Sequence, residues 1–140
     1  MADYFTHFSC VLDVGSPEKA IAALDLLTRL HLDDEGADDP EYSGFGLRQQ
    51  DSPGGSILWL HDEDGDGDVE GVIRFVLRLT EEIDLTGLWG FEFAFTCSRP
   101  RLDAFGGGAH VIDLGKRKSI GWTSTHEWLM AALRGEDVDA

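Results

Sequence analysis

The spacing of apolar residues along this 140-residue chain switches between two periods, and the order of these switches constrains the fold more than any other feature. Apolar residues alternate with polar ones over Tyr4–Val14 and again over Leu88–Ser98, which predicts a strand in each segment. Over Ser16–Leu32 they recur at helical spacing instead. A chain that changes between strand and helix patterns in this way is typical of an α+β protein.

The two long helices are predicted from their ends and their lengths. Ser16 is a good N-cap, Pro17 suits the first helical position, and Glu18 complements the positive end of the helix dipole. The segment Val69–Ile83 has both strand-like alternation and a charged stripe at four-residue spacing. Its length of about 15 residues is long for a strand, so we predict a helix there.

Two pairs of shorter strands complete the pattern. The segments Gly44–Gln50 and Ser56–His61 are separated by a Pro-Gly-Gly turn sequence, which predicts paired strands. Further along, Ala109–Leu114 and Ser119–Thr123 predict a β-hairpin across a short basic turn.

A final short helix is predicted where Ser124 and Glu127 form a capping box. The order is then β-α-β-β-α-β, followed by the hairpin and this helix. We therefore predict one α+β domain over residues 1–140, in which an antiparallel sheet carries helices on one face around a ferredoxin-like βαββαβ core. Residues 136–140 form an acidic C-terminal tail. This fold class by itself implies no function.

The negative charge is concentrated in a few short segments. The chain has 27 acidic and 11 basic residues, which gives a formal net charge of −16. Fifteen of the acids lie in Asp33–Glu41, Asp62–Glu70 and Glu136–Asp139, and these segments contain no Lys or Arg. Close carboxylates repel one another until a cation or a basic partner relieves the cost. The charge balance argues against direct contact with nucleic acid or with an anionic membrane.

The predicted topology brings the first two acidic segments to the same edge of the sheet, because the first helix and the third strand both end there. The loop that contains Arg99 and Arg101 follows the fourth strand and should emerge at the same edge. We therefore predict an acidic rim, partly neutralised by these two arginines, that binds a basic protein partner. Its predicted partner-binding residues are Asp33, Asp34, Glu35, Asp38, Asp39, Glu41, Asp62, Asp64, Asp66 and Asp68.

The second acidic segment partly resembles the calcium loop of EF-hand proteins. Asp62, Asp64 and Asp66 occupy the first, third and fifth ligand positions, and Gly67 occupies the sixth. The twelfth position is Ile73, where a bidentate Glu belongs, and no helix is predicted before the loop. The alternatives are a weak calcium site on the three aspartates and a solvated acidic turn. We expect no other cofactor.

Three consecutive glycines follow two arginines in a predicted loop over 99–108. Glycine N–H groups can approach a ligand closely, and arginine neutralises a phosphate or carboxylate. The loop lacks the spacing of a P-loop and of a dinucleotide fingerprint. The alternative is a flexible loop whose arginines pair with the acidic rim. The predicted anion-binding residues are Arg99, Arg101, Gly106, Gly107 and Gly108.

No motif in the sequence identifies a reaction, and we predict no catalytic residue. Cys10 and Cys97 lie in apolar runs, so we expect buried, reduced thiols, which are poor nucleophiles. The five histidines show no zinc spacing. Reduced cysteines and an N-terminus unlike a secretory signal lead us to expect a cytoplasmic protein.

The sequence thus leads to a non-enzymatic binding protein of the inhibitor, immunity or anti-restriction type, acting through the acidic rim. One alternative is a small-molecule or anion-binding domain, or a small enzyme, that uses the segment Arg99–His110. Another is weak calcium binding at Asp62–Asp68. The sheet face away from the helices also offers a binding surface unless the C-terminal elements cover it. Its polar residues are His7, Ser9, Glu92 and Thr96. The sequence does not determine the oligomeric state.

Overall fold

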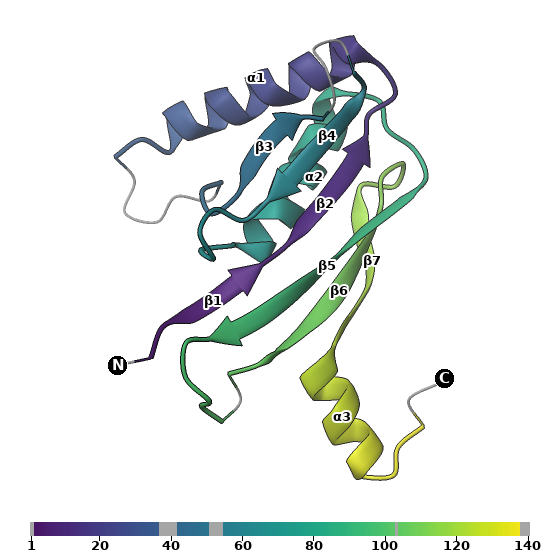
Figure 1. Ribbon diagram of the computed structural model, residues 1–140. Helices are drawn as coiled ribbons and strands as arrows, with labels where there is room; N and C mark the ends of the chain where they lie inside the picture. Colours follow the sequence, from purple (N-terminus) through teal and green to yellow (C-terminus); the bar gives the residue numbers. More distant parts are fainter. Residues whose placement is uncertain (1, 37–41, 51–54, 103, 138–140) are drawn as a thin grey trace.

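Two antiparallel sheets share one interrupted N-terminal strand (Figure 1). The computed structural model describes residues 2–36, 42–50, 55–102 and 104–137. The predicted first strand is divided into β1 (Tyr4–His7) and β2 (Ser9–Asp13). The remaining elements are α1 (Pro17–Asp33), β3 (Gly46–Gln49), β4 (Ile57–His61), α2 (Val69–Glu82), β5 (Leu88–Cys97), β6 (Gly106–Asp113), β7 (Lys118–Ser124) and α3 (Thr125–Leu133).

The strand orders are β1-β5-β6-β7 in one sheet and β2-β4-β3 in the other, and all these pairs are antiparallel. The predicted α+β class is confirmed. Where the sequence predicts one antiparallel sheet, the structure has two, because the first strand changes partner halfway along. His7 is paired with Ala94 of β5, whereas Ser9 is paired with His61 of β4. The ferredoxin-like label stays a prediction.

Phe8 is the residue at which the strand divides. Its side chain is buried at 4% exposure in the core. Its N–H donates to Asp62 Oδ1 at 2.9 Å, and its carbonyl accepts from the Asp62 N–H at 3.0 Å. Because both backbone groups of Phe8 are bonded to the loop after β4, they do not continue the β1–β5 ladder. The chain therefore bends toward β4 at this position.

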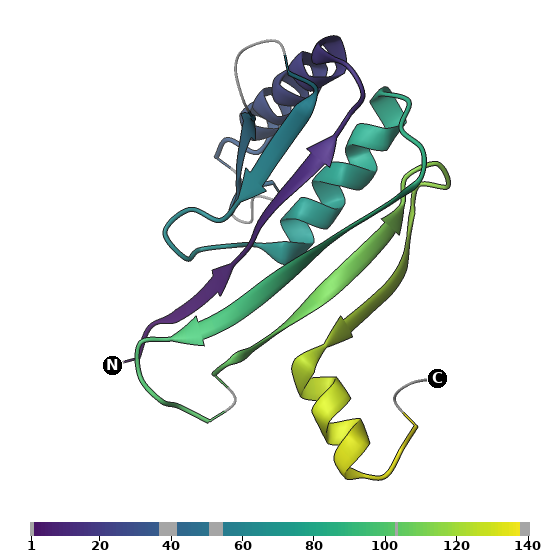
Figure 2. The same ribbon diagram turned by 45° about the vertical axis from the view of Figure 1, so that its right-hand side comes forward.

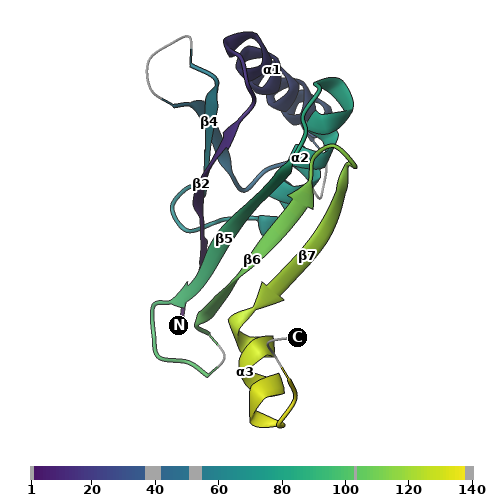
Figure 3. The same cartoon turned by 90° about the vertical axis from the view of Figure 1, so that its right-hand side faces the viewer.

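Helices α1 and α2 lie on the same side of the two sheets (Figure 3). The predicted cap of α1 is confirmed, because Ser16 Oγ accepts from the Lys19 N–H at 3.2 Å. The prediction of a helix over 69–83 is confirmed by α2. Phe75 of α2 is fully buried, and the centroid of its ring lies 5.6 Å from the centroid of the Phe45 ring. These helices, together with the inward faces of both sheets, enclose one hydrophobic core.

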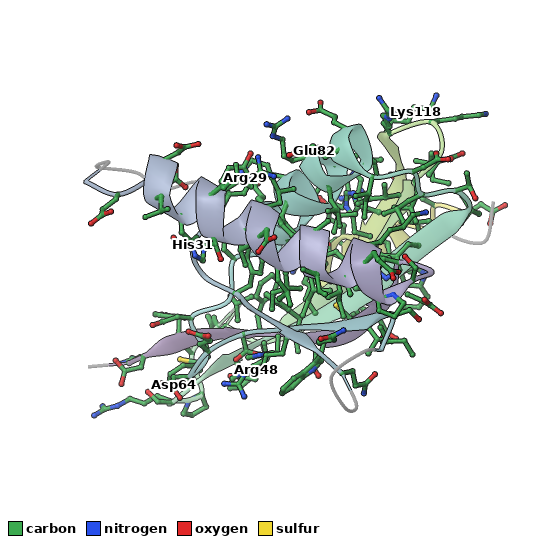
Figure 4. All side chains as sticks on the ribbon, turned by 90° about the horizontal axis from the view of Figure 1, so that it is seen from above. Arg29, His31, Arg48, Asp64, Glu82 and Lys118 are labelled. Carbon is green, nitrogen blue, oxygen red and sulfur yellow. The ribbon has the colours of Figure 1, made fainter. Side chains whose placement is uncertain are left out.

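An ion pair joins the two helices near the surface. Arg29 of α1 donates to Glu82 Oε1 of α2 at 2.9 Å, and Figure 4 shows the two side chains on neighbouring helices. Both side chains are partly exposed, so the pair contributes little to stability beyond fixing the helix orientation.

The C-terminal part departs from the prediction at one boundary. The glycines of the segment predicted as a loop begin β6, and Gly106, Gly107 and Gly108 are paired with β5. A Cβ on Gly108 would collide with the Thr123 carbonyl and would lie 2.8 Å from the Phe93 ring. Glycine is therefore required here by the close approach of neighbouring strands.

Helix α3 extends beyond the end of the four-stranded sheet, far from α1 (Figures 1 and 2). Its predicted capping is confirmed, because Ser124 Oγ accepts from the Glu127 N–H at 3.1 Å. None of the helices in the described residues combines the length and the apolar character needed to cross a bilayer.

Candidate functional site

The segment after α1 connects the two acidic segments. Asp34 Oδ2 accepts from the Tyr42 N–H at 3.2 Å, and His31 Nε2 lies 2.9 Å from the Tyr42 carbonyl. Two residues later, the Gly44 carbonyl accepts from the Asp68 N–H at 2.9 Å. These hydrogen bonds hold the C-terminal end of α1 against the residues at the start of α2. The described parts of the two acidic segments consequently lie at the same end of the fold.

Gly44 makes this close approach possible. Its φ is +87°, which L side chains rarely adopt, and a Cβ at this position would lie 2.6 Å from the Asp68 Cβ. A side chain at residue 44 would therefore push the two acidic segments apart.

The carboxylates of the acidic rim differ in exposure and in partners. Asp68 pairs with Arg74 at 3.4 Å, and Glu70 lies 3.6 Å from the same guanidinium. Asp34 is half-buried at the contact with Tyr42. The predicted residues Asp38, Asp39 and Glu41 lie outside the described residues. The exposed carboxylates of the described part of the rim are Asp33, Glu35, Glu63, Asp64, Asp66 and Glu70.

Asp62 is a structural anchor rather than an exposed rim residue. Its side chain is only 16% exposed and accepts from the N–H groups of Phe8 (2.9 Å) and Gly65 (3.0 Å). His7 Nδ1 lies 3.3 Å from its Oδ2 atom. Burial raises the pKa of Asp62, but these hydrogen bonds outweigh it and leave the pKa below its usual value. The turn signature Asp-x-x-Gly could have indicated this role from the sequence.

The same histidine connects Asp62 to the neighbouring sheet. His7 Nε2 lies 3.0 Å from Thr96 Oγ1 on β5, so a hydrogen-bonded chain runs from the acid through the imidazole to a hydroxyl. The chain borders a hollow of about 330 Å³. That hollow is lined by His7, Phe8, Ser9, Asp62, Glu92, Phe93 and Ala94.

A second hollow of about 410 Å³ shares Ser9 and Glu92 with the first. The first hollow lies where the N-terminal strand changes partner from β5 to β4, and the second is lined by residues of β2, β5 and β6. Three of the four polar residues predicted on the face away from the helices thus line one hollow, and Thr96 contacts its histidine.

The three aspartates proposed for calcium are not arranged as a ligand set. Across the described residues, no group of three or more His, Cys, Asp or Glu side chains is placed to hold a metal ion. Both Asp62 oxygens receive N–H donors, whereas Asp64 and Asp66 are exposed. Calcium binding at these residues stays a prediction.

The predicted anion-binding residues are divided between two settings. Arg99 and Arg101 are exposed in the loop after β5, and neither forms an ion pair with another described residue. Figure 1 shows this loop beside the N-terminus, away from α1. The rim's cation in the described region is Arg74 instead.

The three glycines are not free to cradle an anion in a loop. They lie in β6, and the Gly107 N–H donates to Thr125 Oγ1 at 3.1 Å. Anion binding by this segment stays a prediction, and these contacts do not support it.

The two cysteines are free thiols, as the sequence predicts, but both are half-buried rather than fully buried. Burial raises the pKa of Cys10 to about 11. A thiol with that pKa is almost wholly protonated near neutral pH, and the protonated form is a poor nucleophile. The geometry of Cys10 therefore does not favour thiol chemistry.

Comparisons with family models, with curated proteins and with solved structures found no match for this chain.

Proposed function

We propose that this chain is a binding protein whose acidic rim docks on a basic surface of another protein. The observation that carries the proposal is a pair of hydrogen bonds between the two acidic segments and the residues that connect them. Asp34 accepts from the Tyr42 N–H, and the Gly44 carbonyl accepts from the Asp68 N–H. This arrangement gathers exposed carboxylates from two distant parts of the sequence at one end of the fold. Arg74 is the cation that the described residues supply to them by ion pairing.

The physical basis is the cost of holding like charges together. Neighbouring carboxylates repel one another, and an arginine-rich or lysine-rich surface removes that repulsion while it gains attraction. A chain with a net charge of −16 also steers basic partners toward itself over a distance of about one Debye length, roughly 8 Å at physiological salt.

The partner class follows from the same chemistry. Basic surfaces of this kind occur on proteins that bind nucleic acid, and a clustered set of carboxylates presents charges of the same sign as phosphates. We therefore infer an inhibitor-like or immunity-like role against such a protein. The proposal concerns a protein partner and requires no cofactor.

The test compares two variants of equal charge. Asp64→Asn with Asp66→Asn removes two exposed rim charges, and asparagine tolerates the φ of +54° at residue 64. The matched control, Glu18→Gln with Asp84→Asn, also removes two charges. Glu18 lies at the start of α1 and Asp84 follows the end of α2, so both are at the ends of these helices away from the acidic rim. The probe is an arginine-rich peptide, titrated into each protein by calorimetry at several salt concentrations.

We expect the rim variant to bind the peptide several-fold more weakly and with a shallower salt dependence, whereas the control keeps most of the affinity. A pull-down from the source cells at low salt should then recover a basic protein that is released at about 1 M salt. Equal weakening by both variants, or capture that is unchanged in high salt, would contradict the proposal.

A second candidate function is the binding of a small polar molecule at the hollow between β2 and β5. The chain Asp62–His7–Thr96 favours it, because it holds an imidazole in a fixed orientation beside a hollow of about 330 Å³. A fragment screen followed by nuclear magnetic resonance tests this candidate. Shifts confined to His7 and Glu92 support it, and shifts elsewhere exclude it.

A further inference from the structure

Helix α3 contributes no residue to the hydrophobic core. The exposed fractions of its large apolar side chains are 51% for Trp128, 49% for Leu129, 41% for Met130 and 72% for Leu133. An isolated helix of nine residues is marginal in water, and burial of an apolar face normally stabilises it. The sequence of α3 is therefore suited to a contact that the single chain does not provide.

The strand before α3 also exposes large apolar side chains. β7 is the edge of its sheet, and six of its seven residues are exposed. Ile120 is 48% exposed and Trp122 is 64% exposed. After Lys118 at its start, β7 carries no charge that would discourage pairing with another strand.

The combined area is close to what a dimer interface requires. We define the β7–α3 surface as Ile120, Trp122, Trp128, Leu129, Met130 and Leu133. At roughly 150–250 Å² for a fully exposed aromatic side chain, their exposed fractions correspond to on the order of 600 Å². A standard interface takes about 800 Å² from each partner, and the backbone of the β7 edge adds to the side-chain area.

A hollow next to this surface offers room for a partner's side chain. It has a volume of about 410 Å³ and is lined almost wholly by apolar atoms of Thr123, Ser124, Thr125, Trp128 and Leu129. It lies at the junction of β7 and α3, so both halves of the β7–α3 surface border it.

We propose that the β7–α3 surface is the interface of a symmetric dimer of this chain. β7 pairs antiparallel with β7 of a second copy, and α3 packs against that copy. Antiparallel pairing of two identical edge strands is compatible with a two-fold axis, which makes the same patch serve both partners. The pairing would also remove the exposed edge of the four-stranded sheet.

The distribution of charge favours a second copy as the occupant. Residues 1–87 hold 20 acids and 5 bases, whereas residues 88–140, which include the acidic tail, hold 7 acids and 6 bases. Because the second region is close to neutral, two copies can approach through it without bringing the acidic segments 33–41 and 62–70 together. A basic partner would be drawn to the acidic rim instead, at the other end of the fold from α3 (Figure 1).

The first test measures the mass of the full chain by analytical ultracentrifugation over a range of protein concentrations. We expect a monomer–dimer equilibrium whose dissociation constant rises by roughly tenfold or more in Trp128→Glu and in Leu133→Glu. Because neither residue is part of the core, both variants should keep the wild-type urea midpoint when measured as monomers. The control is Ile21→Glu, which alters an exposed apolar residue of α1 and should leave dimerisation unchanged.

The second test addresses the strand pairing. Hydrogen exchange of the β7 amides should slow as the dimer fills, and Trp122→Lys should reverse this protection. Higher salt should not dissociate the dimer, which separates this interface from binding at the acidic rim. A chain that stays monomeric at all concentrations would overturn the proposal. A dimer that is equally stable in the α3 variants would overturn it as well.

Discussion

The first 87 residues and residues 88–135 differ in both charge and burial. The first region carries 20 acids against 5 bases and supplies α1 and α2, whose inner faces are buried. The second carries 4 acids against 6 bases and ends in α3, which has no buried residue. Figure 4 shows Asp64 of the acidic rim and Lys118 of β7 on opposite sides of the molecule.

This difference shows that the net charge of the whole chain is a poor guide to its surfaces. The first region has a large excess of negative charge, while residues 88–135 lack net negative charge and expose apolar side chains. Salt distinguishes them, because it screens charge contacts and leaves apolar contacts intact.

The largest expected effect comes from truncating the core of the first region. Phe75→Ala removes a fully buried ring that contacts Phe45, so it should lower the free energy of unfolding by about 3–5 kcal/mol. Trp128→Ala in α3 removes an even larger aromatic side chain, yet it should leave the stability of the monomer nearly unchanged. Urea denaturation of both variants at low protein concentration checks the comparison. Equal losses of stability would show that α3 belongs to the core.

Glycine substitutions sharpen the comparison inside the second region. Gly108→Ala places a methyl group against the Thr123 carbonyl and the Phe93 ring, so it should cost about 1–3 kcal/mol. Gly121→Ala on the adjacent β7 meets nothing within 4 Å and should be close to neutral. Thermal unfolding measures both. A cost at residue 121 that disappears on dilution would indicate that β7 is covered by a second copy.

Asp62→Asn tests the anchor of the second acidic segment. The amide cannot accept from all the donors that surround the carboxylate, so the free energy of unfolding at neutral pH should fall by about 1–3 kcal/mol. Because the folded pKa of Asp62 is depressed, its contribution is complete above the unfolded value of about 3.9. The contribution is lost as the pH falls through the folded pKa. The difference between wild type and variant in urea denaturation should therefore shrink in acid.

Local signals in the sequence predicted most elements. Ser16 and Ser124 cap the helices that they were expected to cap, and the helix over 69–83 forms as its length indicated. The division of the first strand was missed because Phe8 fits the alternation and its hydrogen bonds to Asp62 join residues 54 apart in the sequence. Single-chain periodicity carries no information about such contacts.

The candidate site was predictable only in part. Composition located the acidic segments, and topology placed them at one end, but neither could show that Asp62 points inward to His7. Glycine is common in turns, so the glycine run predicts a loop, whereas in the structure it permits close strand approach at Gly108. The exposed character of α3 was likewise invisible, since its apolar spacing is equally typical of a buried helix.

The smallest effect provides the finest test of the comparison, because the two helices carry the same cap. Ser16 accepts from Lys19 in α1, and Ser124 accepts from Glu127 in α3. Ser16→Ala should lower the free energy of global unfolding by about 1 kcal/mol, because α1 is packed on the core. Ser124→Ala removes an equivalent hydrogen bond, but α3 can fray without disturbing the core, so the monomer should keep its midpoint. Its effect should appear instead as a weaker dimer in ultracentrifugation. If both substitutions lower the unfolding midpoint of the monomer equally, α3 is stabilised within one chain and the contrast between the two regions fails.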